Sequence, residues 1–390
     1  MNPKPHILPV IVFAQFACTS LWFAGNAVVS QIPIIRNNSS EYIGYLLSSV
    51  QLGFIIGTLS FALLMVADRF SPSKVFLCCG LLAAACNISI IHPNLNITSL
   101  ILARFGTGFF LAGIYPVGMK IAADYFEDGL GKALGYLVGA LVLGTAFPHF
   151  LKGINWSTSY SFIIKGTSIL ATIGSLALAI FVKNGPFRKP STQLQLRATT
   201  NLFKLKQFKK SAFGYFGHMW ELYAFWAFVP IAFQHFNTIN NSAISSSYVI
   251  FTVIAIGLLS CIIGGYISLK KGSRKVAIFS LAISGICCLC SPLLFELPYI
   301  IFLIVFIIWG MAVIADSPQF STLVAKSAPP ELKGTGLTIV NCIGFGISIV
   351  SIQLLSYLSM LIPIKFLFIP LVIGPIFGLY HLLKKSSNKL

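Results

Sequence analysis

Four ionisable residues interrupt long apolar stretches of this 390-residue sequence, and they are the first candidates for chemistry. Two are cations, Arg104 and Lys165, and two are carboxylates, Glu221 and Asp316. A charged group in hydrocarbon costs several kcal/mol and is retained where it faces a cavity or a partner. The cations are suited to hold an anion, and the carboxylates are suited to bind and release a proton. The alternative interpretation is a set of buried ion pairs that tie helices together.

The segment around Glu221 adds a second titratable group and several aromatic rings. His218 precedes Glu221 by three residues, so the two side chains share one face of a helix. A histidine near a carboxylate titrates in the physiological range and can relay protons. Tyr223 and Trp226 follow on the same stretch and are suited to stack on a ligand. We therefore predict proton coupling at Glu221, Asp316 and His218, with a packed polar cluster as the alternative.

Further polar side chains lie inside apolar stretches at depths where a small molecule can bind. Each of them is equally suited to hydrogen bonding between helices. The full predicted binding set of cations, aromatic rings and polar groups is Arg104, Lys165, Tyr115, Tyr223, Trp226, Asn26, Gln319 and Asn341.

These residues are carried by twelve apolar segments, each long enough to cross a bilayer. Hydrophobic residues make up 56% of the sequence and charged residues 9%, and the mean hydropathy is +0.87. A helix needs about 20 apolar residues to cross a hydrocarbon core of about 30 Å, and helices satisfy their own backbone groups in lipid. The sequence thus predicts an all-α membrane protein with twelve transmembrane helices. The predicted spans are 7–29, 43–66, 74–92, 97–122, 132–151, 158–182, 211–235, 244–268, 275–295, 298–324, 335–358 and 362–383.

The net charge of +18 is distributed as a membrane topology signal. If the N-terminus is cytoplasmic, 21 of the 27 Lys and Arg residues lie in cytoplasmic segments, three lie on the other side, and three lie inside spans. This excess of cations on one side is typical of cytoplasmic loops. We therefore predict that both termini are cytoplasmic, that the lipid bilayer is the partner of this charge, and that no nucleic acid is bound.

The chain divides into two similar halves around its longest connection. We predict a six-helix bundle over 1–182, a basic cytoplasmic linker over 183–210 and a second six-helix bundle over 211–390. Glycines and prolines recur at a spacing of 202 residues, Gly108 with Gly310 and Pro116 with Pro318. Parallel six-helix repeats are a transporter plan with the substrate site between the halves. Within the linker, residues 200–210 are predicted to form a short interfacial helix, with a solvated connection as the alternative.

Two motifs resemble those of the major facilitator superfamily. The connection between the second and third spans contains Asp68, Arg69 and Lys74 at the spacing of that family's loop signature, and the fourth span carries Arg104 and Gly108 like its R-x-x-x-G motif. The segments 104–120, 214–226 and 315–325 are similar to a bacterial branch near the nitrate and cyanate permeases. The resemblance implies two six-helix pseudo-repeats and gating of the cytoplasmic face by Asp68, Arg69 and Lys74.

From the residues and the resemblance we expect a secondary transporter in a bacterial inner membrane. We expect it to move a small, anionic organic solute by proton-coupled symport, as a monomer with no cofactor or metal. The alternatives are proton-antiport efflux of a metabolite or drug, and a non-transporting receptor with the same fold. A phosphate-binding loop and a His-Glu-x-x-His zinc motif are missing from the sequence, so we predict neither an ATP-driven pump nor an enzyme.

Overall fold

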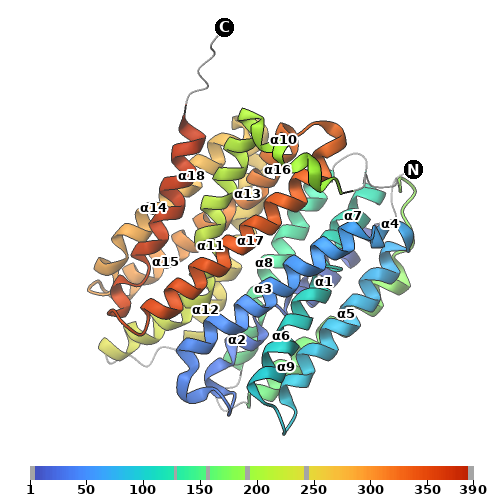
Figure 1. Ribbon diagram of the computed structural model, residues 1–390. Coiled ribbons are helices and arrows are strands. Elements are labelled where there is room, and N and C mark those ends of the chain that lie inside the picture. The colour runs from blue at the N-terminus through green and yellow to red at the C-terminus, as the bar shows by residue number, and fades with distance from the viewer. Residues whose placement is uncertain (1–4, 127–129, 155–158, 189–193, 241–245, 385–390) are drawn as a thin grey trace.

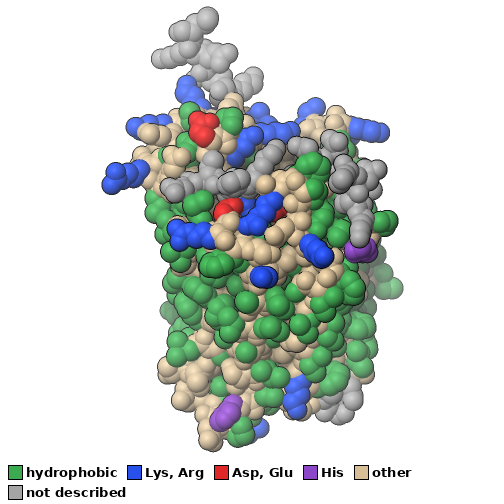
Figure 2. Space-filling view, turned by 90° about the vertical axis from the view of Figure 1, so that its right-hand side faces the viewer, with side chains coloured by type: hydrophobic (Ala, Val, Ile, Leu, Met, Phe, Trp, Pro, Cys, Tyr) green, Lys and Arg blue, Asp and Glu red, His purple; other side chains and the backbone are tan. Residues whose placement is uncertain are grey.

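The computed structural model describes the chain except residues 1–4, 127–129, 155–158, 189–193, 241–245 and 385–390. All regular elements in the described part are helices, arranged as one bundle with both chain ends at the same side (Figure 1). We call this side the terminal face and the opposite side the distal face. Figure 2 shows Lys and Arg gathered at the terminal face above a broad apolar belt. The predicted twelve-helix membrane fold is confirmed.

Ten of the spans in the described part are long and apolar enough to cross a membrane by length and composition. The other two are the short first helix and the 34-residue α11, which carries three lysines near its start. In chain order the spans are α1 (Ile7–Thr19) with α2 (Ala24–Ala27), α3 (Ser39–Leu63), α5 (Pro72–Ile88), α6 (Ile97–Leu111) with α7 (Tyr115–Tyr125), α8 (Leu130–Ile154), α9 (Tyr160–Phe181), α11 (Lys206–Ile239), α12 (Ser246–Ala255) with α13 (Gly257–Lys271), α14 (Ser273–Leu294), α15 (Tyr299–Ala315) with α16 (Ser317–Ser327), α17 (Lys333–Leu358) and α18 (Ile373–Leu383).

The first span is broken, although the sequence predicted one span over 7–29. α1 ends at Thr19 and a turn precedes α2. In lipid the carbonyl groups of such a turn need donors from a neighbouring element. The guanidinium of Arg104 on α6 supplies them, because it donates to the backbone oxygens of Leu21 and Trp22. The break is therefore held by a side chain from another helix.

The fourth and tenth spans are broken at equivalent places. α7 restarts with Pro116 in its first turn, and α16 restarts with Pro318 in its first turn, just after the break at Asp316. Proline lacks the backbone N–H and clashes with the preceding turn, so a helix is interrupted before it. The two breaks thus follow from one repeated sequence feature.

Two glycines at the same spacing let helices approach closely in each half. A Cβ atom at Gly108 would come within 1.9 Å of the Val50 carbonyl oxygen on α3, and one at Gly310 would come within 2.1 Å of the Val253 carbonyl oxygen on α12. Small residues at such crossings allow direct backbone packing between membrane helices. The pseudo-repeat therefore extends from sequence to packing.

The halves meet along two pairs of membrane spans on the distal side. α3 contacts α17, where Gln353 donates to Ser48 at 2.8 Å and Ser348 donates to Gln51 at 3.1 Å. α8 contacts α12 and α13, where the rings of Phe150 and Phe251 lie 5.2 Å apart. Toward the terminal face, a pocket lined by Thr58 of α3 and Asn341 of α17 lies between the halves.

Two glycines on the second pair of spans lie beside open space. A Cβ atom at Gly135 on α8 or at Gly265 on α13, both nearer the terminal face, would meet no atom of the described residues within 4 Å. The described contacts between the halves therefore lie mainly at the distal side, with open space beside Gly135 and Gly265 nearer the terminal face.

The predicted helix over 200–210 is present in two pieces, because α10 (Thr199–Lys204) ends before Leu205 and α11 begins at Lys206. The first residues of the linker are attached to the first half. Arg188 donates to the backbone oxygens of Asp68 and Phe70 at 2.8 Å each. Its later part is attached to α17, where the Gln195 amide donates to Thr335 at 3.2 Å.

Candidate functional site

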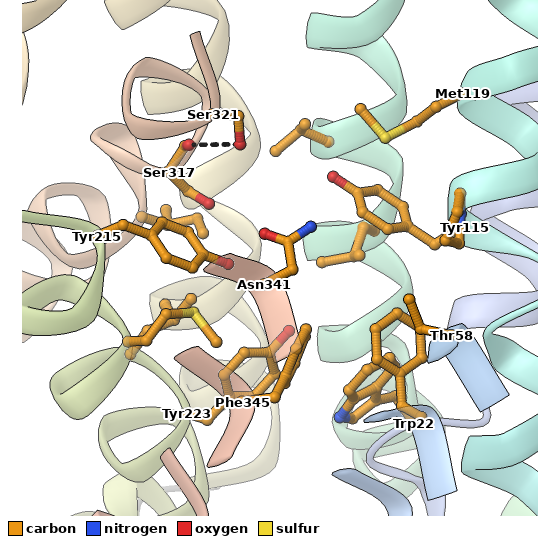
Figure 3. A pocket seen from close by; sticks show the side chains of 17 residues that line it. Trp22, Thr58, Tyr115, Met119, Tyr215, Tyr223, Ser317, Ser321, Asn341 and Phe345 are labelled. Atoms are coloured by element: carbon orange, nitrogen blue, oxygen red, sulfur yellow. Dashed lines mark hydrogen bonds between the residues drawn. The ribbon is translucent and has the colours of Figure 1, made fainter. Parts of the chain in front are cut away.

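A pocket lies between the two halves near the middle of the bundle (Figure 3). It contains about 730 Å³ of empty space, including the part open to solvent. Its walls come from both halves and include the first turns of α7 and α16, the two helices that restart after the proline-linked breaks. The lining residues are Trp22, Phe54, Thr58, Tyr115, Pro116, Met119, Val138, Leu141, Tyr215, Met219, Leu222, Tyr223, Ile314, Ser317, Ser321, Asn341 and Phe345.

Polar groups converge on this pocket from opposite halves. Figure 3 shows the Tyr115 hydroxyl, the Asn341 amide and the Tyr215 hydroxyl directed into the space between the halves. Ser317 lies beside them, and its backbone oxygen accepts a hydrogen bond from the Ser321 hydroxyl at 3.2 Å. Thr58 Oγ1 is buried and has no hydrogen-bond partner among the described residues. These groups are available to the polar atoms of a bound molecule.

Aromatic rings close the distal end of the pocket. Trp22 stacks on Tyr223 with ring centroids 5.7 Å apart and an interplanar angle of 26°. Phe345 of α17 lies 5.6 Å from Trp22 and 5.2 Å from Tyr223. Phe54 of α3 completes the group. Because Trp22 and Tyr223 come from different halves, this aromatic layer can form only while the distal side is closed.

A histidine and an aspartate form a buried pair directly behind the pocket wall. His218 Nδ1 lies 2.8 Å from Asp316 Oδ1, and each side chain is 1% exposed. Asp316 occupies the break between α15 and α16, immediately before the pocket-lining Ser317. His218 lies on α11 between the pocket-lining Tyr215 and Met219. The structure thus brings together two of the three residues predicted to couple protons.

Glu221, the third of them, lies against a different set of helices. Its Oε1 accepts hydrogen bonds from Trp309 Nε1 at 2.7 Å, from Cys288 Sγ at 3.3 Å and from the Ser284 hydroxyl. These donors belong to α14 and α15, so the carboxyl group joins three helices of the second half. Its surroundings are those of a fixed structural acceptor.

Arg104, predicted to hold an anion, does not line the pocket. Its side chain is 0% exposed. Besides the oxygens of Leu21 and Trp22, its guanidinium donates to Asn87 Oδ1 at 3.2 Å. The side chain therefore joins α6 to the broken first span and to α5. A buried arginine with three acceptors is part of the framework of the first half.

We expect Arg104→Gln to lower the melting temperature in detergent by several degrees, because three buried acceptors lose a charged donor worth about 1.5–3 kcal/mol in a hydrogen bond. Lys165→Gln is the matched control, because Lys165 is exposed on α9. A variant that melts like the wild type but no longer binds solute would instead assign Arg104 to the binding site.

The remaining predicted binding residues divide between the pocket and its surroundings. Tyr115, Tyr223 and Asn341 line it. Trp226 is 0% exposed and packs edge-on to Tyr223, with centroids 5.5 Å apart. Asn26 lies nearer the distal face, where its amide donates to the Ile43 oxygen at 3.0 Å. The other two lie elsewhere: the lining residues include neither the exposed Lys165 nor the buried Gln319.

The predicted gating residues lie at the terminal face. Asp68, on the short helix α4 (Val66–Arg69), forms an ion pair with Lys120 of α7 at 2.7 Å. Arg69 and Lys74 are exposed. The loop motif is therefore attached to the fourth span within the first half.

Several lining residues were missed by the prediction. Tyr215 lies eight residues before Tyr223 and Met219 four residues before it, so helical spacing places all three on one face of α11. This spacing could have identified Tyr215 and Met219 as neighbours of the predicted Tyr223. The sequence gives no comparable signal for Thr58 and Phe345, since a single hydroxyl group or ring in an apolar span is as well suited to ordinary packing between helices.

Comparisons with known proteins agree with this architecture. The sequence profile described as the Major Facilitator Superfamily matches residues 11–352. A solved structure of the nucleoside transporter NupG superimposes with a TM-score of 0.73 over 96% of this chain and 98% of that one, at 15% sequence identity. No match is found among curated proteins. The profile spans most of the chain and the fold agrees with it, and the chain therefore belongs to the major facilitator superfamily.

Proposed function

We propose that this chain carries a small organic solute across a bacterial inner membrane by alternating access, coupled to protons. The observation that supports this best is the position of the buried His218–Asp316 pair. It lies behind the wall of a pocket between the halves, at the break before Ser317. A bound solute that presses on this break changes the surroundings of the carboxyl group, and protonation in turn changes the helix that the solute contacts.

The two halves, 1–182 and 211–390, are proposed to move as units joined by the linker 183–210. With the aromatic layer closed and the terminal side of the interface open, the structure corresponds to a state accessible from the terminal face. If that face is cytoplasmic, this is the inward-facing state. The outward-facing state then requires Trp22 and Tyr223 to separate and the terminal ends of α3 and α17 to approach.

The orientation is tested by labelling single cysteines from outside intact cells. In a variant without the native cysteines, Thr200→Cys on α10 should stay unlabelled by an impermeant reagent, and Asn38→Cys on the distal side should react. The reason is the excess of Lys and Arg at the terminal face, which favours the cytoplasm. Labelling of residue 200 but not of residue 38 would show that the orientation is the reverse of the predicted one.

Asp68 is proposed to help close the terminal face once the halves approach. We expect Asp68→Asn to reduce the initial transport rate about tenfold, corresponding to about 1.4 kcal/mol, because the loop loses its ion pair with Lys120. Glu296→Gln is the control, since Glu296 is a carboxylate 68% exposed and paired with Lys365. Full transport by Asp68→Asn would remove this role.

The transport proposal itself is tested in proteoliposomes with a pH-sensitive dye inside. Uridine is offered because of the nucleoside transporter with this fold, lactate and nitrate because of the expected anion and the resemblance to nitrate and cyanate permeases. We expect at least one solute to enter together with protons. Protons leaving as the solute enters would favour the antiport alternative. Binding without any flux would favour the receptor alternative.

A further inference from the structure

We propose that the pocket selects an uncharged solute that combines a flat ring with hydroxyl groups. This inference rests on the proposed function, because it takes the pocket between the halves as the transport site. It departs from the expected anion on one observation: among the described residues that line the pocket, none is Lys, Arg, His, Asp or Glu. An anion taken out of water needs a charged donor or several aligned ones, and leaving it unpaired costs several kcal/mol.

The buried His218, Asp316 and Arg104 do not change this conclusion, because they do not line the pocket. His218 and Asp316 contact each other at 2.8 Å and are each 1% exposed. Arg104 is fully buried, and its guanidinium donates to acceptors of the first half. A solute in the pocket therefore meets neutral groups only.

The side of the pocket toward the terminal face is suited to hydroxyl groups. Tyr115 from the first half and Tyr215 and Asn341 from the second point their polar atoms into one space (Figure 3). A phenol and an amide each donate and accept, which matches the alternating donors and acceptors of a polyhydroxyl group. Thr58 Oγ1 is buried with no hydrogen-bond partner among described residues, so a solute that reaches it satisfies a group that otherwise costs free energy.

The distal side of the pocket is suited to a ring. Trp22, Tyr223, Phe54 and Phe345 form a layer in which neighbouring ring centroids lie 4.9–5.7 Å apart. A flat solute ring that rests on this layer continues the stacking. Trp22 Nε1 lacks a partner among the described residues and can donate to a ring acceptor. A solute therefore contacts both sides of the pocket fully only if it contains both a flat ring and hydroxyl groups.

Equilibrium binding to the purified full-length protein tests this proposal with three probes. Uridine carries a flat ring and a ribose without charge. Uridine 5′-monophosphate adds a negatively charged phosphate group to uridine, and ribose lacks the flat base ring. We expect uridine to bind at least tenfold more tightly than either of the others. Tighter binding of the monophosphate, equal binding of ribose, or no uridine binding at millimolar concentration would overturn the proposal.

Three variants assign the contacts. We expect Tyr115→Phe, Thr58→Val and Asn341→Leu each to weaken uridine binding about fivefold to tenfold, since each removes a hydrogen-bonding group. Tyr266→Phe and Thr252→Val make the same chemical changes at exposed positions of α13 and α12 and should have no effect. Tyr115→Phe removes a single oxygen, so it remains informative if Asn341→Leu fails to fold. Equal affinity in Tyr115→Phe and Tyr266→Phe, together with equal affinity in Thr58→Val and Thr252→Val, would refute the assignment.

The outcome is separable from that of the transport proposal. If lactate or nitrate moves with protons in proteoliposomes while uridine fails to bind, transport stands and the neutral solute is rejected. If uridine binds as described but no solute crosses the membrane, the pocket assignment stands and transport is rejected.

Discussion

Asp316→Asn is expected to abolish solute accumulation driven by a pH gradient while leaving solute exchange intact. Asparagine preserves the shape of the side chain but cannot take up and release a proton. The His218–Asp316 pair is buried at the break beside Ser317, so its protonation can be linked to the position of α16 against the solute. The measurement is accumulation across an imposed pH gradient, compared with counterflow exchange at equal pH.

Glu221→Gln is the informative comparison for this prediction. Glutamine retains an oxygen that accepts from Trp309, Ser284 and Cys288, so we expect accumulation to survive with at most a moderate loss. Loss of accumulation in Glu221→Gln but not in Asp316→Asn would transfer the coupling role to Glu221. Normal accumulation in both variants would mean that neither carboxyl group couples protons.

The second large effect is expected at the two repeated glycines. Gly108→Ala and Gly310→Ala should each strongly reduce the yield of folded protein, because the new Cβ atom would lie 1.9 Å or 2.1 Å from a backbone oxygen of the facing helix. A backbone atom cannot rotate aside as a side chain can, so the helices must separate. Overpacking costs about 1–3 kcal/mol or more in well-packed interiors. Size-exclusion profiles and melting in detergent report the loss.

Two other helical glycines, on α8 and α13, provide matched controls. A Cβ atom at Gly135 or Gly265 meets no described atom within 4 Å, so alanine there should be neutral or slightly stabilising, given its higher helix propensity. If all four alanine variants behaved alike, close helix approach at Gly108 and Gly310 would not be what stabilises the helix packing within each half.

The sequence predicted the fold well because its signals are local. Apolar length identifies spans. The spans 97–122 and 298–324 were predicted as continuous, and the structure breaks both of them just before Pro116 and Pro318, which are the local signals of these breaks. The break after Thr19 carries no such mark. It depends on Arg104, which lies far along the chain and reaches the turn only after the helices pack. For the same reason the role of Arg104 could not be predicted, since an intramembrane cation looks alike whether it faces a solute or a carbonyl group.

The binding residues were predictable where helical spacing grouped them and unpredictable elsewhere. Tyr223 and Tyr215 share a face of α11, whereas Thr58 becomes a pocket residue only because α3 and α17 separate at its level. Lys165 was predicted to bind the solute but is exposed on α9. Its depth in the sixth span could be predicted from the sequence, whereas the side of the helix to which its side chain points could not. Depth follows from counting residues, while direction depends on which neighbours a helix acquires.

The attachment of the linker at both ends sets a mechanical limit. Arg188 is hydrogen-bonded to the end of α4, and Gln195 is hydrogen-bonded to the start of α17. Only six residues, 189–194, lie between these two anchor points, and the seven Cα–Cα steps from one anchor to the other reach at most about 25 Å in an extended chain. While both anchors hold, the linker acts as a short tether across the terminal face. It bounds how wide that side can open, whatever solute is inside.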